Sequence, residues 1–207
     1  MTALAKSAAR ALALLLVSPL LLLDLLLRGT GSHALFAAMT QLLSLVPGRT
    51  GSYLRLAYLR VVLPDCHPDS FVGFGTLFSQ RDTRLGRGIY VGPQCNIGRC
   101  AIGDDTLVAS GVHIMSGTGQ HNFDDLNTPI RDQGGEYRQI RIGRDCWIGN
   151  GALIMADVGD QSVIGAGSVV TEAIPPRSIA VGNPARVIRR RDESDPVTDS
   201  ATTAASP

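Results

Sequence analysis

The four histidines are the side chains of this chain best suited to acid–base chemistry, since the ordinary pKa of an imidazole lies near neutral pH. His33 lies in an apolar stretch and His67 precedes the repeats described below, so we expect both to be structural or surface residues. His113 stands one residue before Ile114, and His121 lies in the polar segment SGTGQHNFDD. The small residues before His121 would let a substrate approach closely. His113 and His121 are therefore the two candidates for a general base.

A repeat of six residues organises the chain around these histidines. Aliphatic–Gly pairs recur with this spacing, apart from one five-residue step, and they return after a gap; they are Leu85-Gly86, Val91-Gly92, Ile97-Gly98, Ile102-Gly103, Ile142-Gly143, Ile148-Gly149 and Ile164-Gly165. Neither a helix nor an alternating strand produces a period of six. Short strands joined by tight turns, three to a circuit, do produce it. The repeat predicts a three-sided coil over residues 66–185, with the aliphatic residues stacked inside.

The repeat is interrupted by residues 115–139, a polar segment that contains His121. A long excursion from a regular repeat is usually functional, and we expect this loop to be so. After the last repeats, residues 178–191 are expected to form a final strand, the turn GNPA and a short basic helix. The end of the chain, residues 192–207, is rich in Ser, Thr, Ala and Asp and is predicted to be disordered.

Residues 1–65 form an apolar and basic zone that we expect to be a helical anchor. Residues 11–27 are nearly all aliphatic, have basic flanks, and reach the lower length limit for crossing a bilayer. Pro19 and Asp24 argue against a simple spanning helix, because a carboxylate at the centre of a bilayer costs about 3 kcal/mol.

Two further apolar stretches follow at residues 34–46 and 52–63. In the second of these, Arg55 and Arg60 stand among Leu, Tyr and Val, which indicates an interfacial amphipathic helix. The preferred interpretation is a helical zone embedded in a membrane or lying on it, with the contact made through residues 11–63. The alternative is a helical cap that packs on the coil, or a set of helices that associate in an oligomer.

The charge balance and the cysteine spacing indicate whether the chain recruits nucleic acid and whether its cysteines are reduced. The chain has 19 Lys and Arg against 18 Asp and Glu, so it has no global charge to recruit nucleic acid. The four cysteines show no CxxC spacing, and we expect them to be reduced core or turn residues of a cytosolic protein rather than a disulfide or metal site. They are Cys66, Cys95, Cys100 and Cys146.

Together these features resemble the hexapeptide-repeat acyltransferases, which include galactoside, maltose, serine and polysaccharide O-acetyltransferases. The resemblance rests on the hexads, the loop histidine, the motif WIGNG after the loop, and the closing IGAGSVVTEAIPPRSIAVGNPARVIRR. It covers roughly residues 66–191 and is nearest to bacterial enzymes that acetylate sugars of surface polysaccharides. It implies an all-β, left-handed parallel β-helix that forms a homotrimer with sites at the seams. It also implies transfer from acetyl-CoA to a sugar hydroxyl, with no metal required.

By this resemblance, His121 matches the loop histidine that serves as general base. Trp147, the only tryptophan, would form a wall of the acceptor pocket, where an indole face stacks on a sugar ring. Asn96 could bond an acceptor hydroxyl. Asp124 is placed on the acceptor side as well, where it or Asp125 could fix the tautomer of His121.

The resemblance also places acetyl-CoA in the groove between adjacent prisms. The positions implied to contact it are Ala109, Asn150, Ala166, Thr171, Arg186 and Arg189. The first three would offer backbone groups to the pantetheine amides, and the last three would lie near the adenine and the 3′-phosphate, because guanidinium groups bind phosphate oxygens in pairs. The chain departs from the family at Glu172, where a lysine is common.

Three other functions fit parts of the sequence. Serine O-acetyltransferases carry their histidine within the coil, as His113 is carried here, but they usually have a long soluble helical domain before it. A γ-type carbonic anhydrase needs three histidines on zinc, and His113 and His121 have no evident third partner. In a non-catalytic scaffold the hexads would only build a trimer. We expect an acyltransferase at the cytoplasmic face of the inner membrane, acting on a sugar or lipid-linked glycan.

Overall fold

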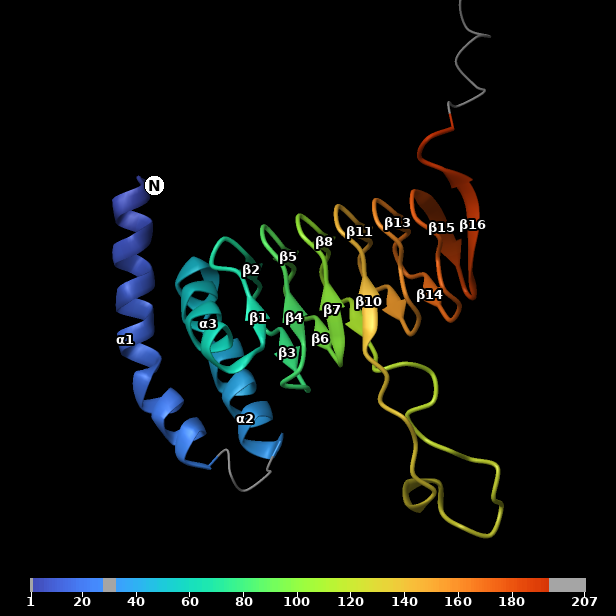
Figure 1. Cartoon of the computed structure of the whole chain (residues 1–207), viewed down its shortest axis with the longest axis horizontal. Helices are drawn as coiled ribbons and strands as arrows, with labels where there is room; N and C mark the ends of the chain where they lie inside the picture. The colour runs from blue at the N-terminus through green and yellow to red at the C-terminus, as the bar shows by residue number, and fades with distance from the viewer. Residues whose placement is uncertain (1, 28–32, 194–207) are drawn as a thin grey trace, which may run out of the picture.

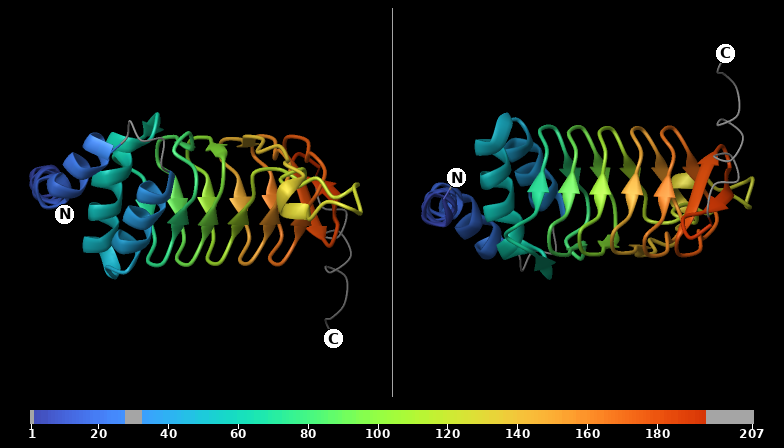
Figure 2. Two further views of the ribbon diagram at one scale, coloured as in Figure 1. Left: turned by 90° about the horizontal axis from the view of Figure 1, so that it is seen from below. Right: turned by 90° about the horizontal axis from the view of Figure 1, so that it is seen from above.

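The computed structural model describes residues 2–27 and 33–193, so the predicted disordered tail lies outside the described residues from position 194 onward. Three helices stand at one end of a long coil of short strands, and a pair of longer strands closes the other end (Figure 1). The two further views show the strands of the coil stacked in rows along its length (Figure 2).

The strands form three sheets, one on each side of the coil, and neighbouring strands are parallel apart from the last pair. The first sheet contains β1 (Asp65–Cys66), β4 (Arg84–Leu85), β7 (Cys100–Ile102) and β10 (Ile140–Ile142). The second contains β2 (Phe71–Val72), β5 (Tyr90–Val91), β8 (Leu107–Val108), β11 (Trp147–Ile148), β13 (Val163–Ile164), β15 (Ser178–Gly182) and β16 (Ala185–Arg190). The third contains β3 (Leu77–Phe78), β6 (Asn96–Ile97), β9 (His113–Ile114), β12 (Leu153–Ile154) and β14 (Val169–Val170). This arrangement confirms the predicted parallel β-helix.

The six-residue period follows from the two-residue strands. The second residue of nearly every such strand points inward and is buried, whereas the first lies on the outer surface or is only half-buried. The inward aliphatic residues stack from one turn of the coil to the next, and the aliphatic members of all seven Gly pairs are buried. Cys95, Cys100 and Cys146 are also buried, Cys66 is half-buried, and all four are free thiols, as the sequence predicts.

The three helices are stacked on the first turn of the coil. Helix α2 (His33–Ser44) and helix α3 (Gly48–Val62) pack on the first strands, and helix α1 (Ala3–Leu27) packs on α3 as the outermost layer (Figure 1). One side of α1 is buried at Ala13, Val17 and Asp24. Much of the remainder is exposed leucine, and Leu15 is 69% exposed. By length and composition, α1 is the one helix of residues 2–27 and 33–193 that could cross a membrane.

Two ion pairs fasten α1 to the rest of the protein. Near its start, Nη2 of Arg10 lies 2.5 Å from the carboxylate of Asp69. Near its end, the guanidinium of Arg81 donates two hydrogen bonds to the carboxylate of Asp24, which is 1% exposed. The hydroxyl of Tyr58 donates a third at 3.1 Å. Asp24 therefore docks α1 on the protein, which accounts for a carboxylate in an aliphatic helix.

The prediction that residues 52–63 form an interfacial amphipathic helix is wrong. Most of α3 is buried between α1 and the coil, and Arg55 is among its buried residues. The guanidinium of Arg55 donates to the carbonyl of Leu43 in the last turn of α2, to that of Val46 just beyond α2, and to that of Val72 in the coil. The last carbonyls of a helix have no partner within it, so a buried arginine supplies one. Its burial lowers the pKa of Arg55 to about 10.

The predicted short C-terminal helix is also wrong. Residues 185–190 form β16, which pairs antiparallel with β15 after the turn GNPA. Strand β15 would otherwise leave an edge of unpaired N–H and C=O groups, and six residues are too few for a stable helix. The final strand and the turn are as predicted, and the hairpin caps the end of the coil.

Candidate functional site

The loop of residues 115–139 leaves the coil after β9, re-enters it at β10, and projects away from it (Figure 1). Its two arms run side by side, because the N–H of Arg138 donates to the carbonyl of Ser116 at 2.8 Å and the N–H of Glu136 donates to that of Gly119 at 2.7 Å. A short 3-10 turn, η2 (Ile130–Asp132), lies at the far end. The loop is therefore an ordered arm with its own hydrogen bonds.

His121 is exposed on this arm. Its ring meets the ring of Tyr137 edge-on, with centroids 6.5 Å apart and planes at 79°. Behind it, a Cβ at Gly135 would collide with the carbonyl of Gln120 and lie 2.8 Å from the nitrogen of His121, so glycine is needed where the two arms pass. The sequence reasoning missed Tyr137 and Gly135, although an aromatic residue and a Gly-Gly pair in a polar loop were a usable signal.

The two aspartates after His121 differ in role. The carboxylate of Asp125 accepts hydrogen bonds from the N–H of Asn127 and the hydroxyl of Thr128, at 2.8 and 2.6 Å. The bond from Thr128 lowers the pKa of Asp125. Asp125 thus closes the turn at the loop tip, whereas Asp124, which is exposed as well, remains the carboxylate that could serve an acceptor.

Arg99 fixes the base of the loop, a role that the sequence did not indicate. Its Nη1 donates to the carbonyl of Tyr137 at 2.6 Å, its backbone N–H donates to the hydroxyl of Ser116, and its Nε pairs with Asp82. One residue therefore holds both arms where they join the coil, through its backbone on the Ser116 arm and its side chain on the Tyr137 arm. This places the backbone of Tyr137, and with it the ring beside His121.

His113 and Asn96 are neighbours on the third sheet. They occupy equivalent positions on β9 and β6, in parallel register, and both side chains are exposed. Adjacent strands are about 4.8 Å apart, so the two side chains form one polar patch. The loop leaves the coil directly after this patch, at Ile114.

Trp147 lies on a different side of the coil. It is 56% exposed on β11 of the second sheet, in a row of apolar side chains with Leu107 and Val163. The row continues to Tyr90, which stacks on Phe71 with ring centroids 5.0 Å apart. A single chain therefore does not bring Trp147 together with Asn96, because strands of different sheets face outward in different directions.

The three backbone positions predicted to contact acetyl-CoA share one corner of the coil, between the second and third sheets. Ala109, Asn150 and Ala166 lie there on successive turns. The corner is formed by glycines in the left-handed conformation; they are Gly111, Gly151 and Gly167, with φ of 67°, 65° and 67°. The N–H of Ala109 and the carbonyl of Asn150 already bond within the coil, so a ligand here would need other groups of this corner.

The predicted phosphate-binding side chains lie near the C-terminal end of the coil. Thr171 is half-buried directly after β14, and Arg186 and Arg189 lie on β16. Nη2 of Arg186 is 3.9 Å from Oε1 of Glu172, and both side chains are exposed. Glu172, the departure from the family pattern, thus stands beside the arginine that is expected to bind phosphate. Within the described ranges, no group of three or more His, Cys, Asp or Glu side chains could hold a metal ion.

Comparisons with known proteins agree with this architecture. Residues 139–172 match the family described as "Bacterial transferase hexapeptide (six repeats)". Galactoside O-acetyltransferase of Escherichia coli K12 is 43% identical over 97 residues, which are 45% of each chain. A maltose O-acetyltransferase from Clostridium difficile 630 superposes with a TM-score of 0.66 at 29% identity, covering 76% of this chain and 86% of that one. The coil of this chain is therefore similar to those of hexapeptide-repeat transferases and O-acetyltransferases.

A second similar solved structure is a galactoside acetyltransferase in complex with coenzyme A, with a TM-score of 0.64, 27% identity, and coverage of 77% of this chain and 81% of that one. The matched segments are shorter against the curated relatives. They span 31% of a probable acetyltransferase of Mycobacterium tuberculosis and 58% of a putative acetyltransferase of Staphylococcus aureus. The chain thus spans about half the length, or less, of the curated hexapeptide-repeat relatives it matches.

Proposed function

We propose that this protein transfers an acetyl group from acetyl-CoA to a hydroxyl of a sugar or glycan, in the assembly of surface polysaccharide or lipid-linked glycan. His121 is the general base. Its neutral imidazole takes the proton of the acceptor hydroxyl as the oxygen attacks the thioester carbonyl. The new ester forms, the carbon–sulfur bond breaks, and the thiolate of CoA leaves and is then protonated.

The observation that carries this proposal is the ordered arm that presents His121 outside a coil like those of the galactoside and maltose O-acetyltransferases. An exposed imidazole on a braced loop can meet a hydroxyl without unfolding any part of the coil. A general base at such a position contributes about 10²–10⁴ in rate. Asn96 and His113 offer a polar patch at the root of the same loop, where acceptor hydroxyls could be held.

The donor would lie along the corner of Ala109, Asn150 and Ala166 and reach Arg186 with its phosphates. The corner fits an extended pantetheine arm, because its glycines keep side chains away from the backbone. Arg186 fits a phosphate, although Glu172 competes for it at 3.9 Å. Thr171 and Arg189 complete the proposed phosphate end of the site.

A homotrimer would complete the site. His121 and Trp147 belong to different sides of one chain, and the row of Tyr90, Leu107 and Trp147 leaves apolar surface exposed. Packing this row against a second copy removes that surface from water and can bring a Trp147 beside the His121 of another subunit. With three copies around one axis, the interface between each pair of neighbouring subunits is the same.

We also propose that the protein lies at the cytoplasmic face of the inner membrane, and that within residues 11–63 the outer side of α1 makes the contact. The leucines on the outer side of α1 support contact with lipid. The bonds of Asp24 to Arg81 favour a helix that lies along the bilayer surface, because a spanning α1 would have to break them. The catalytic coil would then stand in the cytoplasm, where CoA is found.

Calorimetry and kinetics on the full chain in dodecyl maltoside test the proposal. Acetyl-CoA should bind saturably, and Arg186→Ala should weaken it. With a panel of sugar acceptors, His121→Ala should lower kcat by about 10²–10⁴ and leave acetyl-CoA binding intact. His67→Ala, far from the loop in the chain, is the matched control and should change neither.

If His121→Ala keeps full activity and His113→Ala loses it, the general base is His113 on the coil. Absence of acetyl-CoA binding in the wild type would instead favour the non-catalytic scaffold.

A further inference from the structure

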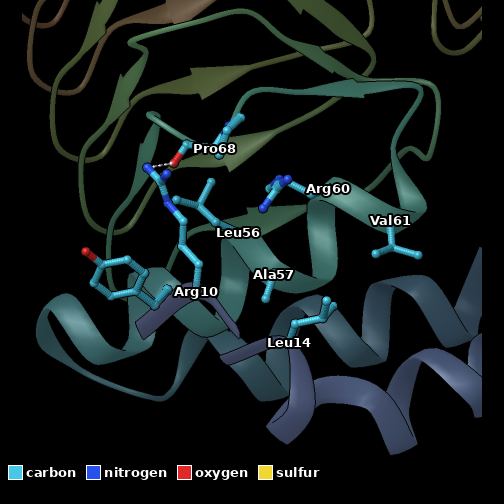
Figure 3. Close-up of a pocket in the computed structure, with 8 residues that line it drawn as sticks. Arg10, Leu14, Leu56, Ala57, Arg60, Val61 and Pro68 are labelled. Atoms are coloured by element: carbon cyan, nitrogen blue, oxygen red, sulfur yellow. Dashed lines mark hydrogen bonds between the residues drawn. The ribbon is translucent and has the colours of Figure 1, made fainter. Parts of the chain in front are cut away.

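A small cavity between α1 and α3 has the lining expected of a site for an anionic amphiphile (Figure 3). It measures about 110 Å³. Its aliphatic lining comes from both helices and consists of Leu14, Leu56, Ala57 and Val61. The guanidinium groups of Arg10 and Arg60 stand on either side of Leu56 (Figure 3). An apolar wall between two cations can hold a hydrocarbon chain and an anion together.

The charge around this cavity is one-sided. A wider neighbouring hollow of about 630 Å³ shares Arg10 and adds Lys6 and Arg49 to its lining. Among the residues that line the two hollows, Asp69 is the one carboxylate, and Arg10 binds it. Lys6, Arg49 and Arg60 therefore give the cleft an excess of positive charge.

Arg10 also has spare bonding capacity. Its Nη2 donates to the carbonyl of Pro68 and to Asp69, but its Nε is buried without a hydrogen-bond partner among the described residues. Buried donors are nearly always paired, so an unpaired one that lines a cavity indicates a place for a ligand oxygen. A phosphate supplies such an oxygen and accepts from guanidinium groups in pairs.

We propose that the cleft between α1 and α3 binds a membrane lipid through its phosphate. The phosphate lies on Arg10 and Arg60, and the first part of the acyl chain lies against Leu14 and Val61. Those two side chains are 46% and 52% exposed, so the apolar wall reaches the surface beside the exposed leucines of α1. A free phosphate would use the arginines and leave this wall in water, so the lining selects the lipid. This site goes beyond the proposed acetyl transfer and does not depend on it.

The test measures binding of fluorescent phosphatidic acid to the full-length protein in dodecyl maltoside, without CoA or acceptor. A fluorescent diacylglycerol with the same chains lacks the phosphate, and inorganic phosphate lacks the chains. The wild type should bind phosphatidic acid saturably and in preference to both. Arg60→Gln should weaken binding about tenfold, the loss expected for one charge-assisted hydrogen bond.

Two further variants serve as a charge control and as a test of the cavity. Arg131→Gln removes the same charge from the exposed loop, and it should bind as the wild type does. Ala57→Leu fills the cavity with aliphatic carbon and should weaken binding while the helical circular dichroism is retained. If Ala57→Leu does not fold, Arg60→Gln decides alone.

Three outcomes would overturn the proposal. Equal affinity in the wild type and Arg60→Gln would show that the guanidinium does not hold the ligand. Equal affinity for phosphatidic acid and diacylglycerol would show that the phosphate is not recognised. Full displacement of the lipid by inorganic phosphate at the same concentration would show a phosphate site without a lipid preference. Since no acetyl donor is present, each is distinct from a failure of the proposed enzyme activity.

Discussion

Removal of the Asp24 carboxylate should weaken the docking of α1 on the protein. Asp24 is 1% exposed, both of its oxygens accept from Arg81, and Tyr58 donates to one of them. Loss of one partner of a buried ion pair costs about 3–5 kcal/mol. The side chain of Arg81 is 19% exposed and its guanidinium lies 4.9 Å from the centre of the Phe36 ring, so water and the ring still accommodate its charge. We therefore expect Asp24→Ala to cost about 3 kcal/mol, the lower end of that range.

Urea unfolding of the full chain in dodecyl maltoside measures this cost, and hydrogen exchange of peptides from α1 shows where it falls. The double variant Asp24→Leu with Arg81→Met replaces the pair by aliphatic groups and should recover much of the stability. The coupling energy of the corresponding cycle should be about 2–3 kcal/mol. Asp132→Asn, in an exposed ion pair of the loop, is the matched control and should change stability by less than about 0.5 kcal/mol.

The same experiment separates two orientations of α1. A helix that lies on the bilayer keeps Asp24 on Arg81, so Asp24→Ala raises hydrogen exchange throughout α1. A helix that spans the bilayer has already left Arg81, and the variant would then exchange as the wild type does. Unchanged exchange together with an unchanged urea midpoint would refute the docking of α1 through this pair.

Two further predictions concern the thiols and the donor site. Burial raises the pKa of Cys66 and Cys100 to about 12, so their labelling by a disulfide reagent at pH 8 should be about three orders of magnitude slower in the native protein than in urea. The unfolded thiols lose their protons near pH 8.5 while the folded thiols keep them, so the free energy of unfolding should fall as the pH rises above 8.5. Rapid labelling of the native protein would contradict both the slow labelling and this pH dependence. Glu172→Gln should tighten acetyl-CoA binding about two- to fivefold by calorimetry, because it removes an exposed negative charge beside Arg186, whereas weaker binding would show that Glu172 positions the arginine.

The sequence predicts the coil well because its signal is local and repeated. Each inward residue such as Ile148 must fit the turns above and below it, and each corner such as Gly151 needs a left-handed backbone. The helical zone is harder to predict because its polar residues act across elements. Arg55 donates a hydrogen bond to the last turn of α2, and Asp24 forms an ion pair with Arg81 of the coil. In both cases the partner belongs to another element of the chain.

The sequence predicts residues of the candidate site, but it does not predict which side of the coil each of them occupies. The loop position of His121 follows from the interruption of the repeat, and Asn96 and His113 share a face because they lie one full circuit of the coil apart. The side of the coil that each strand occupies depends on the number of residues in every preceding turn, including the five-residue step before Ile102. Trp147 was therefore placed in one pocket with Asn96, although a single chain sets them on different sheets.

The positions of α1 and the loop constrain the acceptor. If α1 lies along the bilayer, α1 itself and the layer of α2 and α3 between it and the coil contribute about 10 Å each. The root of the loop at β9 is two strands along its sheet from β3, which adds about 10 Å at 4.8 Å per strand. His121 would then lie about 30 Å or more from the lipid surface, since the arm projects away from the coil and not back towards α1 (Figure 1). A hydroxyl on the sugar next to a lipid phosphate would lie too close to the bilayer to reach it. The geometry therefore favours acceptors whose modified sugar stands several units away from the membrane anchor.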